Sequence, residues 1–90
     1  MRCLEIDNYI EYITSIILRK KYNENDVEKL NKIKDMFYLM KYLFILKKYK
    51  ASLSLLKEIT DISDTLDCLI LRKEIYSSTN NLFFMIKERC

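Results

Sequence analysis

Residues 36–46 read MFYLMKYLFIL, with one charged side chain, Lys41, among ten apolar or aromatic ones. Apolar residues recur at helical spacing on both sides of this stretch, which favours a helix over a strand. At 100° per residue, its apolar side chains point to every side of a helix except the sector held by Lys41. A helix that is apolar all round must be covered by the rest of the chain or by another molecule. We therefore expect a central apolar helix over residues 26–46.

The rest of the chain also shows helical periodicity, without a convincing run of alternating apolar and polar residues. The sequence predicts an all-α protein: a compact bundle of about five short helices forming a single all-helical domain over residues 1–90. The other expected helices cover residues 4–20, 49–59, 64–76 and 81–89. Asn25, with Glu28 three residues later, is the expected N-cap of the central helix. The segment from Ser77 to Asn80 is the plainest loop.

Lys47 and Lys48 are expected to separate the central helix from the next one. The chain contains no Gly and no Pro that would enforce such a break. The alternative is one continuous helix from Asp26 to Ile59. The seam of a short coiled coil would then consist of Leu30, Ile33, Phe37, Met40 and Phe44.

The composition excludes most known kinds of active site. The chain has no His and no Gly, so it lacks the usual base for a nucleophile, imidazole metal ligands and glycine-rich phosphate loops. Asp61, Asp64 and Asp67 lie three residues apart. We interpret them as acids at the N-terminus of a helix, where they complement the helix dipole, rather than as metal ligands. We expect a protein that is not an enzyme, with no catalytic residues, no cofactor and no metal site.

Aromatic residues in and after the central helix form the candidate site. They lie on the side opposite Phe37, Met40 and Phe44, and tyrosine is enriched at protein interfaces because it buries a ring and keeps a hydroxyl for hydrogen bonding. The predicted partner interface consists of Tyr38, Tyr42, Ile45 and Tyr49, with a basic rim of Lys41, Lys47, Lys48 and Lys50. The expected partner is another protein or a second copy of the chain, and ordinary packing within the bundle is the alternative.

Positive charge is concentrated in one third of the chain. The net charge is +3, and residues 19–50 carry ten Lys or Arg against four acids. Cations at helix C-termini account for part of this surplus. The alternative function is a small basic accessory protein that binds nucleic acid. The residues expected to contact phosphates are Lys20, Lys21, Lys47, Lys48 and Lys50.

The stretch from Met36 to Ile59 resembles a single tetratricopeptide helix pair. The matching positions are Leu39, Leu43, Tyr49, Ser52, Leu56 and Ile59. Met40 stands where that family has a small residue, and no 34-residue period recurs along the chain. The resemblance implies a packed helical hairpin. In size alone, about 90 residues in five or six short helices, the chain is similar to death-fold adaptor domains, which implies a modulator of host signalling as a further alternative.

Phe, Tyr, Met, Ile, Asn and Lys, whose codons are rich in A and T, make up half of the chain. We infer an AT-rich genome, such as that of a virus or an intracellular parasite.

The sequence shows no targeting segment. Glu5 and Asp7 precede any apolar run, unlike in a secretory signal, and the longest nearly apolar stretch is far shorter than the ~20 residues of a membrane span. Three cysteines without close spacing, Cys3, Cys68 and Cys90, fit a reducing compartment. We expect an intracellular, cytoplasmic protein of the host or parasite cell, serving as an adaptor, assembly subunit or host-interaction factor.

Overall fold

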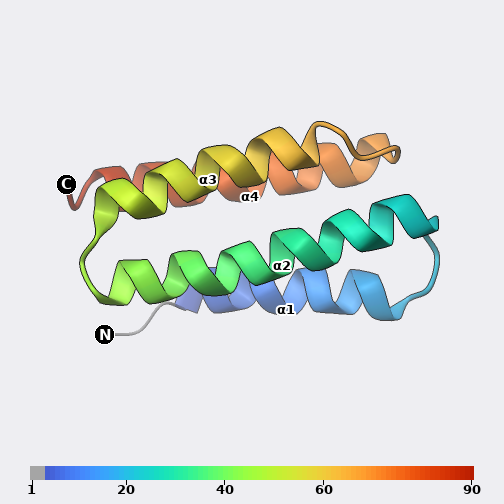
Figure 1. The fold of residues 1–90 in the computed structure, drawn as a ribbon, viewed down its shortest axis with the longest axis horizontal. Coiled ribbons are helices and arrows are strands. Elements are labelled where there is room, and N and C mark those ends of the chain that lie inside the picture. The colour runs from blue at the N-terminus through green and yellow to red at the C-terminus, as the bar shows by residue number, and fades with distance from the viewer. Residues whose placement is uncertain (1–3) are drawn as a thin grey trace.

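A computed structural model describes residues 4–90, which fold into four helices: α1 (Leu4–Leu18), α2 (Glu24–Ile45), α3 (Tyr49–Ser63) and α4 (Leu69–Lys87). The helices run up and down in chain order, so the start of α1 and the end of α4 lie at the same end of the bundle (Figure 1). The all-α prediction is confirmed. The predicted count of about five helices is wrong for the described residues, and the likeness in size to death-fold domains of five or six helices does not extend to helix number.

A single core runs the length of the bundle. Each helix contributes one apolar stripe at the 3.6-residue period. The buried members are Ile6, Ile10, Ile13 and Ile16 on α1; Leu30, Ile33, Phe37, Met40 and Phe44 on α2; Leu56 and Ile59 on α3; and Leu71, Ile75, Leu82 and Ile86 on α4. The hairpin of α2 and α3 packs most extensively, which agrees with the packed hairpin expected around Met36 to Ile59.

The expected helices over residues 64–76 and 81–89 are in fact one helix, α4, and the expected loop over residues 77–80 is helical. The inward stripe continues through this polar stretch because Thr79 occupies a core position between Ile75 and Leu82. Its hydroxyl donates to the carbonyl of Tyr76 at 3.0 Å and lies 3.2 Å from the hydroxyl of Thr60 on α3. A polar side chain whose hydroxyl is satisfied within the bundle therefore takes the place of an apolar one.

The central helix was predicted over residues 26–46, and α2 begins two residues earlier and ends one residue earlier. Its N-cap is Asn23, not Asn25, because the Asn23 side-chain oxygen accepts a hydrogen bond from the backbone N–H of Asp26 at 2.8 Å. The side chain of Asn25 instead donates to the carboxylate of Asp67. The predicted cap residue thus links the start of α2 to the α3–α4 connection.

The predicted break between the second and third helices is present. Lys47 has a φ of 61°, in the left-handed region, and its N–H donates to the carbonyl of Phe44. The N–H of Lys48 donates to the carbonyl of Leu43 at 2.9 Å. These two bonds are those of the Schellman motif, in which a left-handed residue just after a helix satisfies its last carbonyls. The motif ends α2 although the chain has no glycine.

We expect Lys47→Gly to raise the free energy of unfolding by about 0.5–1 kcal/mol, because glycine adopts positive φ without the steric cost of a Cβ atom. Lys47→Ala removes the same charge but keeps the Cβ, so it should leave stability nearly unchanged. Urea denaturation followed by far-UV circular dichroism measures both. Equal effects of the two variants would show that the charge, and not the backbone conformation, limits stability at this turn.

Two helical hairpins, α1 with α2 and α3 with α4, are joined by polar contacts at the end of the bundle where α2 and α4 begin. The side chain of Asp26 is buried, and its two oxygens accept hydrogen bonds from the backbone N–H groups of Asp67 at 2.7 Å and Cys68 at 3.1 Å. Nearby, Lys29 Nζ donates to the carbonyl of Thr65 at 2.8 Å. The connection before α4 is therefore held to the first turn of α2.

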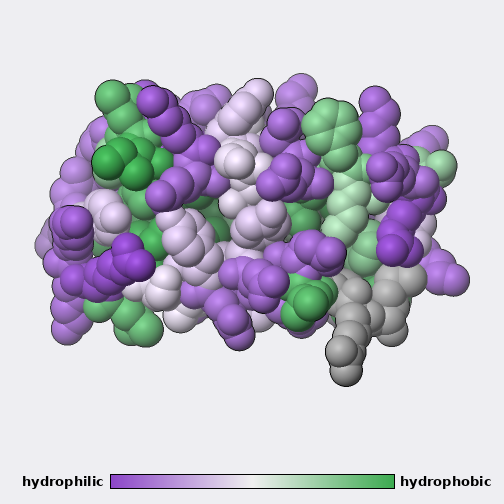
Figure 2. All heavy atoms as spheres, turned by 180° about the vertical axis from the view of Figure 1, so that it is seen from behind, coloured by the Kyte–Doolittle hydropathy of each residue, from purple (hydrophilic) through white to green (hydrophobic). Residues whose placement is uncertain are grey.

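The opposite side of the bundle is closed by α1 and α4, which make the fewest contacts of the neighbouring helix pairs. Asn81 on α4 donates to the hydroxyl of Tyr9 on α1 at 3.3 Å. Seen from this side, hydrophilic and intermediate side chains cover much of the middle of the face, and hydrophobic ones lie toward both of its ends (Figure 2). This seam is polar.

None of the helices described between residues 4 and 90 has the length and hydropathy needed to cross a bilayer. Cys68 and Cys90 are free thiols, half-buried and exposed respectively. Cys3 lies outside the described residues.

Candidate interaction surface

The outer side of α2 carries a group of exposed apolar residues, which we name the α2 patch. Its members are Tyr38, Leu39, Tyr42, Ile45 and Leu46, with exposed fractions between 43% and 60%. The other four lie three or four residues before or after Tyr42, and side chains at these spacings are neighbours on a helix surface. Tyr42, the most exposed of the five, is therefore the centre of the patch.

These residues are exposed because α2 can bury only part of its apolar circumference. The buried stripe through Phe37, Met40 and Phe44 faces the core, and α1 and α3 pack along the two flanks. At 100° per residue, Tyr42 and Leu46 point to the side opposite that stripe. The described part of the chain has no element that covers this side.

The structure brings three of the four predicted interface residues together and separates the fourth. Tyr38, Tyr42 and Ile45 belong to the α2 patch. Tyr49 lies on α3, is half-buried, and its ring packs edge-on against buried Phe44 with the ring centres 5.5 Å apart. Tyr49 thus contributes mainly to the border of the core. Leu39 and Leu46 are patch residues that the prediction missed, although their spacing from Tyr42 carried the signal.

The predicted basic rim does not form one group in the structure, because Lys41 is separate from the other three lysines. Lys41 Nζ forms an ion pair with a carboxylate oxygen of Asp7 on α1 at 2.6 Å, so this lysine ties α2 to α1. Lys47, Lys48 and Lys50 are exposed at the α2–α3 turn, directly after the patch. Surface ion pairs contribute little stability. The pair of Lys41 with Asp7 therefore serves mainly to orient these two side chains.

The five lysines predicted to contact nucleic acid do not form one surface. Lys20 and Lys21 lie in the turn between α1 and α2, whereas Lys47 and Lys48 lie in the turn between α2 and α3 and Lys50 is the second residue of α3. Helix α2 separates the two groups and has 22 residues, a length of about 33 Å at 1.5 Å per residue. The positive surplus seen in the sequence is therefore split between opposite ends of the bundle.

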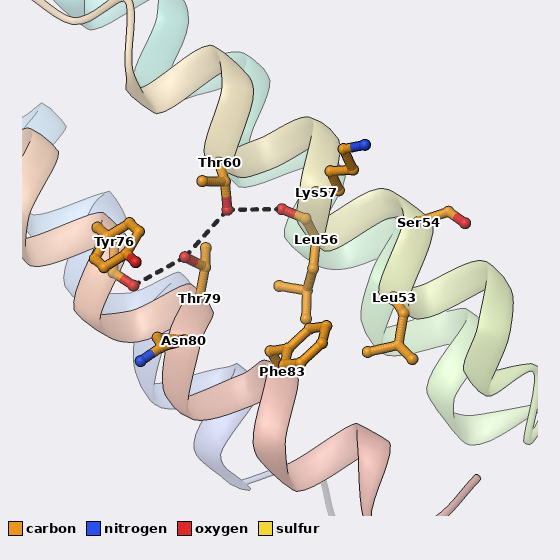
Figure 3. A pocket seen from close by; sticks show the side chains of 9 residues that line it. All are labelled: Leu53, Ser54, Leu56, Lys57, Thr60, Tyr76, Thr79, Asn80 and Phe83. Atoms are coloured by element: carbon orange, nitrogen blue, oxygen red, sulfur yellow. Dashed lines mark hydrogen bonds between the residues drawn. The ribbon is translucent and has the colours of Figure 1, made fainter.

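A second apolar surface is a groove between α3 and α4, with a volume of about 460 Å³. Figure 3 shows the Phe83 ring and the side chains of Leu53 and Leu56 in the space between the helices, whereas Lys57 points away from it. The hydroxyls of Thr60 and Thr79 meet in the same region, and each is within hydrogen-bond distance of a backbone carbonyl of its own helix. The sequence did not reveal this groove, because residues 77–80 were expected to form a loop.

The acidic residues singled out in the sequence do not converge. Asp61 lies on α3, Asp64 follows its end, and the carboxylate of Asp67 accepts hydrogen bonds from Asn23 and Asn25. Within residues 4–90, no three His, Cys, Asp or Glu side chains are grouped closely enough to hold a metal ion. The α2 patch and the α3–α4 groove are apolar surfaces that do not depend on these acids.

Comparisons with models of protein families, with curated proteins and with solved structures give no significant match for this chain.

Proposed function

We propose that this chain is a non-enzymatic helical interaction module that binds another protein chain through the α2 patch. The observation that carries the proposal is the exposure of five large apolar side chains centred on Tyr42. They present an area on the order of 500 Å², which is in the range of the largest apolar patch on a monomeric protein, and such patches are often functional.

The chemistry around the patch supports the same proposal. Two tyrosines supply rigid rings with hydroxyls that remain able to form hydrogen bonds, and tyrosine is enriched at the centre of interfaces. Lys47, Lys48 and Lys50 follow the patch, so a polar and charged rim adjoins an apolar centre. An adaptor, an assembly subunit and a host-interaction factor are all forms of this function, and they differ only in the partner bound.

Nucleic-acid binding has less support, because Lys20 and Lys21 lie about 33 Å of helix away from Lys47, Lys48 and Lys50. Phosphate contacts make affinity fall steeply with salt, whereas burial of an apolar patch does not. Retardation of a DNA or RNA fragment by the purified chain at about 50 mM salt, lost at higher salt, would favour this alternative.

The proposal is tested by placing a photoreactive benzophenone amino acid at position 42 in cells that produce the chain. We expect irradiation to join it covalently to a partner chain, because the ring at this position would lie inside the interface. The same amino acid at Tyr76 is the matched control, since Tyr76 on α4 is exposed to 56% and Tyr42 to 60%. Denaturing electrophoresis measures the adducts.

Adducts at position 42 that are absent at position 76 are the expected result. No adduct at position 42, or equal adducts at both positions, would contradict the assignment of the α2 patch as the contact surface. Adducts at position 76 alone would transfer the function to the α3–α4 groove, which Tyr76 lines.

A further inference from the structure

The apolar residues of the α2 patch are spaced symmetrically in the sequence about Tyr42, and the charged residues beyond its two ends differ. Tyr38 and Leu39 lie before the centre at the same spacings at which Ile45 and Leu46 lie after it. Beyond the apolar residues, the exposed Asp35 stands on the N-terminal side, two helical turns from Tyr42, with the exposed Lys32 and the half-buried Lys34 close to it in the sequence. The exposed Lys47 and Lys48 follow the patch on its C-terminal side, five and six residues after Tyr42.

We infer that the partner of the α2 patch is a second copy of this chain, bound with the two α2 helices antiparallel about a twofold axis at Tyr42. In such a pair each residue meets its counterpart on the other side of the axis, so every contact occurs twice. Tyr38 and Leu39 of one copy face Leu46 and Ile45 of the other. Asp35 of one copy lies beside the turn that carries Lys48 of the other. The inference rests on the proposed function, since it names the partner for the same patch.

The charges of Asp35 and Lys48 favour the antiparallel orientation of the two α2 helices. A parallel pair would place Asp35 beside Asp35 and Lys48 beside Lys48, and like charges at an interface cost several kcal/mol. The antiparallel pair replaces both repulsions with attractions. An unrelated partner would have to supply this complementary arrangement by itself, whereas a second copy carries it already.

The available area also fits a dimer of modest affinity. The apolar patch offers on the order of 500 Å² per copy, and the flanking Asp35 and Lys48 side chains extend it toward the ~800 Å² per partner of a standard interface. The two tyrosines in each copy would bring four rings together around the axis, and aromatic pairs add to the stabilisation from burial alone. We therefore expect a weak dimer that is strengthened at low salt, because added salt screens the attraction between Asp35 and Lys48.

The test exchanges charges at the two ends of the patch and measures molar mass by light scattering and sedimentation. Asp35→Lys and Lys48→Glu are each expected to weaken dimerisation of the purified chain tenfold or more, because each change places like charges together twice. Mixing the two variants should restore dimers, since opposite charges then meet at positions 35 and 48 in both contacts of the mixed pair. Both positions are exposed, so helicity measured by circular dichroism should stay unchanged.

Tyr42→Lys should give a helical monomer, and Tyr76→Lys should dimerise as the wild type does. The inference is overturned if the wild-type chain stays monomeric at millimolar concentration, or if the mixed variants associate no better than each alone. The proposed function fails separately: it stands if the probe at position 42 forms an adduct with a different protein, and falls if it forms none.

Discussion

Replacing Asp26 by Ala should lower the free energy of unfolding by about 3 kcal/mol, because two part-buried backbone N–H groups would lose their acceptor. The side chain of Asp26 is 1% exposed, and its oxygens accept from the N–H groups of Asp67 and Cys68, which directly precede α4. This carboxylate therefore fixes the second hairpin to the first. A loss of this size should reduce the Tm by roughly 10–20 °C in a domain of this length.

The matched control is Glu28→Ala, which removes an exposed carboxylate from the same helix and should change stability by less than about 0.5 kcal/mol. Asp26→Asn should fall between the two, since the amide keeps one oxygen acceptor but turns an N–H donor toward a backbone donor. Urea titrations at low protein concentration separate these effects from association. Equal losses from Asp26→Ala and Glu28→Ala would show that the hairpins are held together by the core alone.

Replacing Ser77 by Pro should cost about 3 kcal/mol or more, because proline inside a helix removes an N–H donor and clashes with the preceding turn. Ser77 lies in the middle of α4 and its side chain is exposed, so the effect comes from the backbone. The core positions Ile75 and Leu82 lie on either side of it, and a break here would misalign the stripe. Fewer residues should then be helical, as measured by circular dichroism.

Ser77→Ala is the control, and it should stabilise the protein by a few tenths of a kcal/mol, because alanine has the higher helix propensity. A loop at residues 77–80 would give the reverse result, with proline tolerated and alanine neutral. The pair of variants thus tests directly the difference between the helix in the structure and the loop expected from the sequence.

The parts of the fold that the sequence predicted well are those with strong local signals. The stripe through Leu30, Ile33 and Phe37 identified the inward side of α2, and the double lysine at 47 and 48 marked its end. The prediction failed at residues 77–80, where Ser, Ser, Thr and Asn have low helix propensity. Packing of Thr79 against Thr60 overrides that propensity, and the partner lies on another helix.

The candidate site shows the same division. The excess of apolar side chains in residues 36–46 and the positions of Tyr38, Tyr42 and Ile45 opposite the core follow from helical geometry alone. The half-burial of Tyr49 depends on where α3 crosses the end of α2, which brings its ring against Phe44. The ion pair of Lys41 with Asp7 depends likewise on the alignment of α1 beside α2.

The sequence by itself determined that the chain is all-helical, that its middle helix has more apolar surface than one side can bury, and that this helix ends near Lys47. These properties arise from residue spacing and from chemistry within a few residues. Only the tertiary structure decided which part of that surface stays exposed, that the basic residues stand at opposite ends of the bundle, and that Asp26 joins the two hairpins. Those outcomes depend on contacts between residues far apart in the chain, and periodicity along one helix carries no information about what packs against it.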